Sequence, residues 1–172
     1  MEYSMNRKIA YYGLLVALAF IFSYVESLFP INFGIPGIKL GLANLVVIVA
    51  LYIFGIKEAI AVSLIRIVLS GLTFSSIAAM AYSLAGGILS LAVMIIAKRL
   101  NKLSAMGVSV LGGVFHNVGQ ILVAIVVLET GSLIYYLPVL IISGLIAGII
   151  IGILAAEVIK RLPKTEERSP NT

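Results

Sequence analysis

The stretch GGVFHNVGQ, residues 112–120, lies in the middle of an apolar run from Val108 to Leu128. At about 1.5 Å of rise per residue, a helix of that length crosses a bilayer. It would place His116, Asn117 and Gln120 about halfway across the hydrocarbon, where polar side chains are costly and usually functional. Gln120 follows the other two by four and three positions, so all three share one helical face. We expect that face to point toward protein or a cavity.

The composition of the chain is that of an integral membrane protein. Of its 172 residues, 62% are hydrophobic and 11% are charged, far outside the range of soluble domains. The run from Ile9 to Phe29 is long enough to span a bilayer and lacks a small-residue cleavage site, so we interpret it as a retained helix. The net charge of +5 falls mainly at the ends of apolar runs, which indicates membrane topology and argues against nucleic-acid binding.

The sequence predicts an all-α fold, a polytopic bundle of six transmembrane helices embedded in membrane lipid. A polar N-terminal segment, residues 1–8, precedes this domain of residues 9–159, and a polar tail, residues 160–172, follows it. The prolines and glycines of the loop at residues 30–37 end the first helix. The six helices are predicted at residues 9–29, 39–54, 59–74, 77–97, 105–128 and 133–159.

The distribution of Lys and Arg supports six crossings. An even number of crossings places both termini on one side, and all Lys and Arg except Lys39 and Arg66 then fall on that side. Because cytoplasmic loops are enriched in Lys and Arg, both termini are predicted to be cytoplasmic. Removing one helix would scatter these charges between the two sides.

Arg66 is the most unusual residue of this topology, because it lies near the middle of a predicted membrane helix. A guanidinium there costs on the order of 2.5 to 3.5 kcal/mol on insertion scales, so it needs a balancing partner. Every carboxylate except Glu26 lies at a cytoplasmic turn, in the external loop or in the tails. Two interpretations of this partner stay open. Arg66 bonds helix-end carbonyls and water, or it bonds the anionic group of a ligand.

The polar residues of the predicted helices lie toward the outer side and define a candidate solute-binding site. For the His116 group, hydrogen bonds that only fix helix packing are an equal alternative. Lys39 at a helix start most simply extends to the lipid headgroups, and a role as a gate or as a contact for an anion is the alternative. The site residues predicted from the sequence are Lys39, Asn44, Arg66, Tyr82, His116, Asn117 and Gln120, with residues 30–37 as a cap.

Glycines mark the predicted packing surfaces. Gly144, Gly148 and Gly152 are four residues apart and form a small stripe that lets another helix backbone approach closely. On the first helix, Gly13 and Ala17 form a similar pair, which either packs inside the bundle or contacts a partner protein.

Several enzyme classes are excluded by what the chain lacks. It has no aspartate, so it cannot form the aspartate-rich Mg²⁺-diphosphate clusters of a prenyl-diphosphate synthase. It has no GxxxxGK[ST] loop for ATP, and one histidine without cysteine makes a zinc site unfavourable. The sequence therefore predicts no catalytic residues, no metal and no cofactor.

Four stretches together resemble one family: KLGLAN at Lys39–Asn44, the R-x-x-L-x-G-L stretch at Arg66–Leu72, SLAGGILSL at Ser83–Leu91 and GGVFHNVGQ. They resemble the Gx transporter family, whose members are often labelled heptaprenyl diphosphate synthase component I. That family is similar to the S components of energy-coupling factor transporters, which are six-helix proteins that bind a vitamin-like solute on the outer side.

The resemblance implies a substrate-binding subunit in the plasma membrane of a prokaryote, docked on a coupling subunit and two ATPases. Gly13 and Ala17 would then face the coupling subunit. The other label implies partnership with a soluble prenyl synthase subunit, for which this chain would be an accessory and not the catalyst.

Overall fold

The computed structural model describes residues 2–28 and 41–162, with side chains described from residue 9 onward. The described part is entirely helical, without strands, which confirms the predicted all-α bundle. Lys39, the loop at residues 30–37 and most of the C-terminal tail lie outside the described residues. The helices are α1 (Glu2–Leu28), α2 (Leu42–Ile53), α3 (Ile56–Thr73), α4 (Ile77–Arg99), α5 (Ala105–Val127), the 3₁₀ helix η1 (Gly131–Tyr136) and α6 (Leu137–Arg161).

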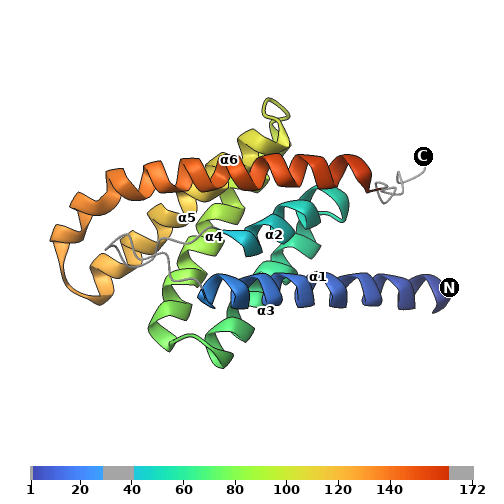
Figure 1. Cartoon of the computed structure of the whole chain (residues 1–172), viewed down its shortest axis with the longest axis horizontal. Helices are drawn as coiled ribbons and strands as arrows, with labels where there is room; N and C mark the ends of the chain where they lie inside the picture. Colours follow the sequence, from blue (N-terminus) through green and yellow to red (C-terminus); the bar gives the residue numbers. More distant parts are fainter. Residues whose placement is uncertain (1, 29–40, 163–172) are drawn as a thin grey trace.

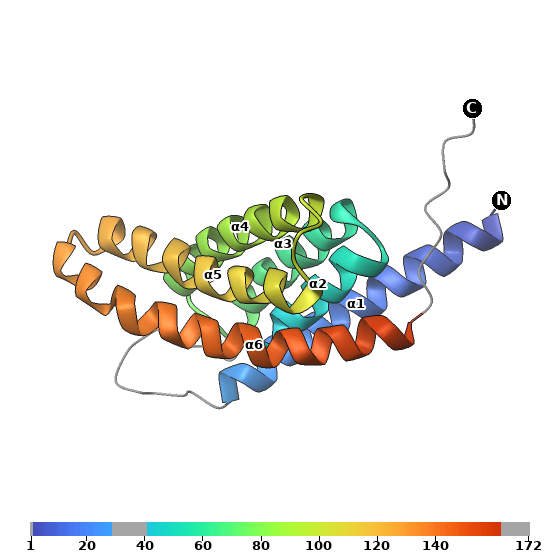
Figure 2. The same ribbon diagram turned by 90° about the horizontal axis from the view of Figure 1, so that it is seen from above.

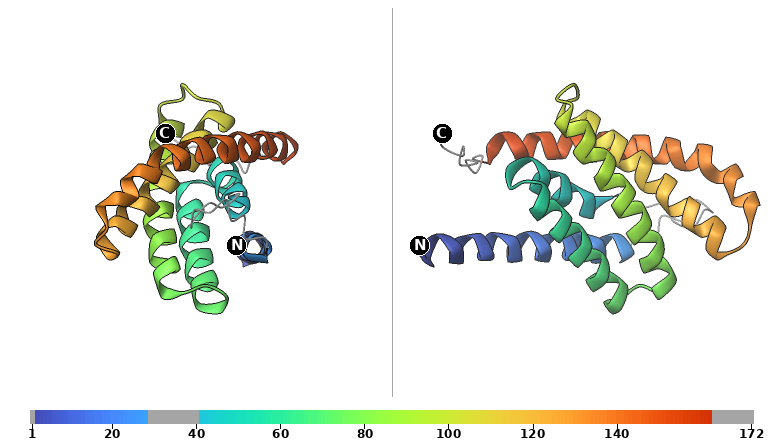
Figure 3. Two further views of the ribbon diagram at one scale, coloured as in Figure 1. Left: turned by 60° about the vertical axis from the view of Figure 1, so that its left-hand side comes forward. Right: turned by 180° about the vertical axis from the view of Figure 1, so that it is seen from behind.

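The helices surround the short helix α2. Helices α1 and α6 run in opposite directions along the long axis, and α2 lies between them (Figure 1). Helices α3 and α4 form an antiparallel hairpin that crosses this pair obliquely, and α5 packs between α4 and α6 (Figures 2 and 3). The start of α1 and the end of α6 lie at one end of the molecule, with the α5–α6 connection at the other.

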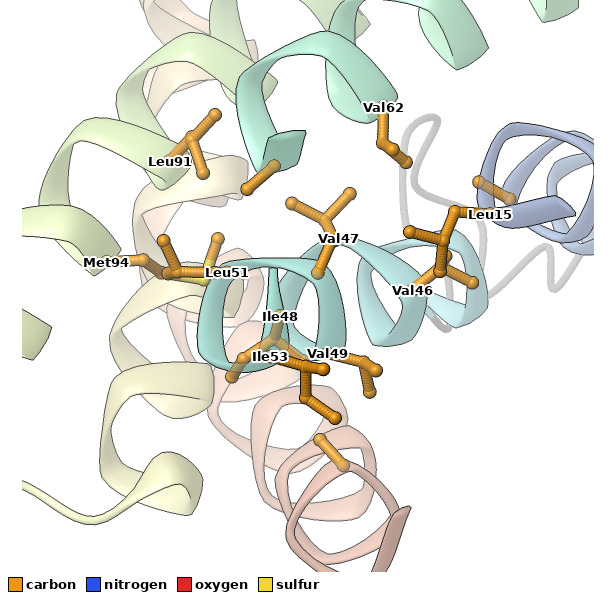
Figure 4. Close-up of a cluster of buried hydrophobic side chains, with 14 of the residues drawn as sticks. Leu15, Val46, Val47, Ile48, Val49, Leu51, Ile53, Val62, Leu91 and Met94 are labelled. Atoms are coloured by element: carbon orange, nitrogen blue, oxygen red, sulfur yellow. The ribbon is translucent and has the colours of Figure 1, made fainter. Parts of the chain in front are cut away.

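Helix α2 forms the centre of the hydrophobic core because, apart from Asn44 near its start, its residues are apolar around the whole helix. Eight of its 12 residues are buried, and Ile48 and Leu51 are completely enclosed. Side chains from the neighbouring helices pack around it, among them Leu15 of α1, Val62 of α3 and Met94 of α4 (Figure 4). An all-apolar helix is stable only when it is surrounded in this way.

Polar contacts hold the end of α2. The Nζ atom of Lys98, in the last turn of α4, donates a 2.6 Å hydrogen bond to the carbonyl oxygen of Leu51. The same ammonium lies 5.2 Å from the centre of the Tyr52 ring, within range of a cation–π interaction. Lys98 thus satisfies one of the carbonyls that a helix C-terminus leaves without an internal partner.

The glycine stripe of α6 lets α5 approach at backbone distance, as the sequence predicts. A Cβ atom at Gly144 would lie 2.7 Å from the carbonyl oxygen of Gly113, and one at Gly148 would lie 2.6 Å from the Cα of Val110. Each distance is shorter than a real Cβ contact, so only glycine fits. At Gly152 the corresponding atom is the Cα of Met106, at 2.8 Å.

The apolar helices make this a multi-pass membrane protein. Four described segments are long and apolar enough to cross a membrane: Ile9–Leu28, Ile77–Arg99, Ala105–Val127 and Gly131–Arg161. With 12 residues, α2 is roughly 18 Å long, short of a hydrocarbon core of about 30 Å. A short apolar helix of this kind is typical of a buried core element. Six complete crossings therefore stay a prediction.

Several helices begin at residues other than the predicted ones, and the local sequence explains each difference. Residues Glu2 to Lys8 belong to α1, because the segment contains no helix breaker. Helix α3 begins at Ile56 after Gly55, at a φ of 125°, so the predicted four-residue turn is shorter. The predicted start at Leu133 falls within η1, and α6 begins at Leu137, with Pro138 in its first turn, where proline lacks no needed hydrogen bond.

The other ends shift less. Helix α2 covers Leu42–Ile53 within the predicted range 39–54, and α3 ends at Thr73. Helices α4 and α6 continue to Arg99 and Arg161, two residues beyond the predicted ends, because Lys and Arg are favoured in the last helical turn.

Candidate functional site

A cavity of about 110 Å³ lies among the six α-helices. Its lining comes from the C-terminal ends of α1 and α3, the N-terminal ends of α2 and α4, and the middle parts of α5 and α6. The basic residues at the opposite ends, such as Lys57 at the start of α3 and Lys98 at the end of α4, are not part of it. The cavity therefore occupies the half of the bundle remote from the basic turns.

Arg66 brings a positive charge to this cavity from α3. Its Nε atom is buried and has no hydrogen-bond partner among the residues that the structure describes. Ser70, one turn further along, also lines the cavity, but its hydroxyl donates to the Ile67 carbonyl of its own helix at 3.1 Å. The guanidinium thus retains a donor for which the described protein supplies no acceptor.

The end of α1 brings a carboxylate to the same cavity. Glu26 lies close enough to Arg66 to attract its guanidinium electrostatically. It also accepts a hydrogen bond from the backbone N–H of Gly41, the residue that precedes α2. Gly41 has a φ of 76°, a left-handed conformation that glycine adopts without strain. Glu26 therefore connects α1, α2 and the charged group of α3.

Adjacent residues of α5 have different neighbours. His116 lines the cavity and lies against α4, where a Cβ at Gly86 would be 3.2 Å from its Cε1 atom. Asn117, which also lines the cavity, donates a 2.7 Å hydrogen bond from Nδ2 to the carbonyl oxygen of Leu140 on α6. The hydrogen bond of Asn117 thus links α5 to α6, which is the helix-packing alternative that the sequence left open for this group. Both His116 and Asn117 border the cavity.

The cavity brings together four of the predicted site residues: Asn44, Arg66, His116 and Asn117. Tyr82 and Gln120 are not among its lining residues. Gln120 lies against α4 instead, where its Cγ atom would be 2.8 Å from a Cβ at Gly86. Helix α5 packs between α4 and α6, so side chains on one face of α5 contact different helices.

The predicted partner-contact residues of α1 lie on its outer surface. Gly13 and Ala17 are both exposed, and a Cβ at Gly13 would meet nothing within 4 Å. Neither residue packs inside the described part of the bundle. Leu15 and Ala19 are the buried residues of the same helix.

Several lining residues are absent from the site predicted from the sequence, including Glu26 and the serines of α1 and α3. Their spacing contains a signal. Ser23, Glu26 and Ser27 are three and four residues apart on α1, and Ser70 is four residues after Arg66, so each set shares a helical face. Phe74 and Met80 are apolar lining residues that no sequence pattern distinguishes from core residues.

The site offers hydrogen bonding and charge, without a metal-binding cluster. No group of three or more His, Cys, Asp or Glu side chains lies together in the described part of the chain. A guanidinium, a carboxylate, an imidazole and two side-chain amides surround a small space among apolar groups, an arrangement typical of binding sites for small molecules.

Comparison with known proteins places the chain in a family. No curated protein and no solved structure matches it. A family model described as heptaprenyl diphosphate synthase component I matches residues 15–158, which include the lining residues of the cavity in every helix. The match covers most of the chain, and the protein therefore belongs to the heptaprenyl diphosphate synthase component I family.

Proposed function

We propose that this chain is a membrane-embedded solute-binding subunit that takes up a small solute with an anionic group, together with a separate ATPase module. The cavity is its binding site. Arg66 contacts the anionic group, and Asn44 and His116 supply directional hydrogen bonds. The sequence motifs resemble a family that is similar to S components. The general class of ligand is therefore the vitamin-like or cofactor-like solutes that S components bind.

The observation that carries this proposal is the buried Nε atom of Arg66, a residue that lines the cavity and for which the described residues supply no acceptor. A guanidinium in a membrane helix has a large free-energy cost, and buried polar groups in proteins nearly always have a hydrogen-bond partner. A ligand oxygen in the cavity supplies the missing acceptor. Charge-assisted bonds of this kind are roughly twice as strong as neutral ones.

The position of the cavity supports uptake from outside the cell. Lys57, Lys98, Arg99, Lys102, Lys160 and Arg161 lie at helix ends or turns remote from the cavity. By the positive-inside rule these ends are cytoplasmic, as are both termini, in the plasma membrane of a prokaryote. The cavity then lies in the outer half of the membrane.

Energy for transport would come from partner proteins. The sequence has no phosphate-binding loop for ATP and no aspartate, so we assign ATP hydrolysis to two ATPases and a coupling subunit. The exposed Gly13 and Ala17 give α1 a smooth surface for the coupling subunit. This chain is then a binding subunit and not an enzyme.

Native mass spectrometry of the protein in mild detergent tests the proposal. We expect wild-type protein to carry a small molecule at stoichiometric occupancy, and Arg66→Ala to lose it while the protein stays monodisperse. Arg66→Lys tests whether the charge alone suffices. The matched control is Arg99→Ala at the exposed end of α4, which should retain the molecule. A wild-type spectrum without a bound molecule, or equal occupancy in Arg66→Ala, would contradict the assignment.

The family description favours a second candidate function, an accessory membrane subunit of heptaprenyl diphosphate synthase. Without aspartate, the chain would tether or regulate a soluble catalytic subunit and not form the diphosphate site itself. Affinity purification from the native membrane separates the two candidates. Recovery of ATPases and a coupling subunit supports solute uptake, whereas recovery of an aspartate-rich prenyl synthase supports the accessory role.

A further inference from the structure

The side of α3 that borders the cavity changes from charged to aromatic along the helix. Arg66, Ser70 and Phe74 all line the cavity. They follow one another at intervals of four residues, so they share one face of α3. Phe74 directly follows the last residue of the helix, about two helical turns beyond Arg66. A ligand lying along α3 therefore meets a guanidinium in the middle of the helix and an aromatic side chain at its end.

Two half-buried apolar side chains form the aromatic end of the cavity. Phe74 is held by two rings of α1, because the ring centres of Phe20 and Tyr24 each lie 5.5 Å from its own, within the range of aromatic pairs. Met80 of α4 packs against Gly71, where a Cβ would lie 2.5 Å from its Sδ atom. Phe74 and Met80 thus give the cavity an apolar wall beside the connection between α3 and α4.

Three serines of the cavity wall are less available to a ligand than their number suggests. The hydroxyl groups of Ser23 and Ser27 donate to carbonyl oxygens of α1 at 2.9 and 2.6 Å. Ser70 donates in the same way within α3. Such a wall disfavours a solute with many acceptor oxygens, because a buried acceptor without a donor is costly. It suits a solute with one anionic group, placed at the free donor of Arg66.

The size of the cavity restricts the solute further. Its volume of about 110 Å³ is comparable to the roughly 150 Å³ of an engineered cavity in another protein that binds benzene. The unbranched, flexible side chain of Met80 can adapt its shape to a bound molecule. The cavity therefore suits a solute built on a single ring. A prenyl diphosphate is much longer and carries several negative charges.

We propose that the solute is a small aromatic acid, with its single anionic group at Arg66 and its ring against Phe74 and Met80. This inference rests on the proposed function, because it names the class of solute for the same site. Phe74 is then a specificity-determining residue. It selects a solute with a ring, whereas Arg66 selects the negative charge.

Three sets of probes separate the ring from the charge. The aromatic acids are benzoate, para-hydroxybenzoate and phenylacetate, the second set contains their uncharged amides, and the third contains the hydrophilic anions acetate, lactate and phosphate. Thermal unfolding of detergent-purified protein, freed of solute by dialysis, reports binding. We expect at least one aromatic acid to raise the unfolding midpoint of the wild type. Its amide and the hydrophilic anions, at the same concentration, should leave the midpoint within error.

Phe74→Leu tests the role of the ring, because leucine keeps an apolar side chain at this position. The probes are the stabilising aromatic acid and its saturated analogue, in which a cyclohexane ring replaces the aromatic one. We expect Phe74→Leu to bind the aromatic acid about three- to tenfold more weakly and the saturated acid as the wild type does. A general disturbance of the fold would weaken both. The control is Tyr135→Leu, at an exposed aromatic residue of η1 outside the cavity, which should keep the wild-type preference.

The outcomes separate this inference from the proposed function. Stabilisation by the hydrophilic anions as strong as by the aromatic acids overturns the aromatic solute and leaves solute binding intact. The same holds for a co-purified molecule whose accurate mass gives a formula without an aromatic ring, whereas a formula with a ring and one acid group supports the inference. An unchanged preference in Phe74→Leu overturns the role of Phe74.

Two further results would contradict the proposed function itself. Equal stabilisation by the amides would show that Arg66 does not select an anionic group. If no probe stabilises the protein and native spectra show no bound molecule, solute binding fails together with the aromatic acid.

Discussion

The carboxylate of Glu26 accepts a hydrogen bond from the backbone N–H of Gly41, and this contact ties the end of α1 to the start of α2 beside the cavity. At the other end of α2, Lys98 of α4 donates to the Leu51 carbonyl. Helix α2 has no side-chain cap of its own at Gly41. Charged residues of neighbouring helices therefore hold both ends of the buried central helix.

Removing the charge of Lys98 should destabilise the folded bundle. Lys98→Met retains most of the side-chain volume but loses the bond to Leu51 and the cation–π contact with Tyr52. We expect a loss of about 2 kcal/mol in the free energy of unfolding. Thermal unfolding in detergent measures it, with exposed Lys102→Met as the control. Equal midpoints for the two variants would exclude a structural role for Lys98.

A single methyl group should disrupt the contact between α5 and α6. In Gly148→Ala the new Cβ would lie 2.6 Å from the Cα of Val110, so the two backbones must separate. Overpacking of this kind typically costs about 1–3 kcal/mol. Gly13→Ala is the matched control, because its Cβ meets nothing within 4 Å. We expect a lower unfolding midpoint for Gly148→Ala alone. Unfolding of both variants at the wild-type temperature would show that the backbone contact between α5 and α6 does not require glycine at residue 148.

Asn117 should contribute to stability even without solute. Asn117→Leu removes the 2.7 Å bond to Leu140, which links α5 to α6. Interhelical bonds in membranes contribute about 1 kcal/mol. Ser70→Ala removes only a bond within its own helix, so it should have a smaller effect. Unfolding of dialysed protein distinguishes the two, and an unchanged midpoint for Asn117→Leu would show that this bond is not stabilising.

Much of the bundle follows from the sequence because the apolar runs are long and the breakers between them are clear. The close approach at Gly144 and Gly148 is also encoded in a local pattern, a small residue every four positions. The environment of Gln120 is different. Its face is predictable, but whether that face meets α4, α6 or a cavity depends on tertiary packing, which helical periodicity does not contain.

The composition of the cavity shows the same limit. Arg66 is conspicuous in the sequence because a charge in a membrane helix is costly, whereas Glu26 lies close to a predicted helix end and looks like a surface residue. Only the arrangement of α1 against α2 and α3 brings the two charges to one space. The sequence already predicts a short helix at residues 39–54, and α2 is shorter still, at Leu42–Ile53.

Membrane orientation can be measured directly, since the chain contains no cysteine. Lys57→Cys and Lys102→Cys, both at exposed positions near basic turns, should react with a membrane-impermeant maleimide only in inverted vesicles. Ser132→Cys, exposed in the connection between α5 and α6, should react only in right-side-out vesicles. Labelling of Lys102→Cys from the outside would reverse the proposed side of the cavity.

The most direct test of solute binding is an experimental density map of the purified protein with its native solute. We expect density for a small molecule between the helices, within hydrogen-bond distance of the Arg66 guanidinium and bordered by Asn44 and His116. A map in which side chains fill this space, with Arg66 directed to lipid headgroups or to helix-end carbonyls, would contradict it.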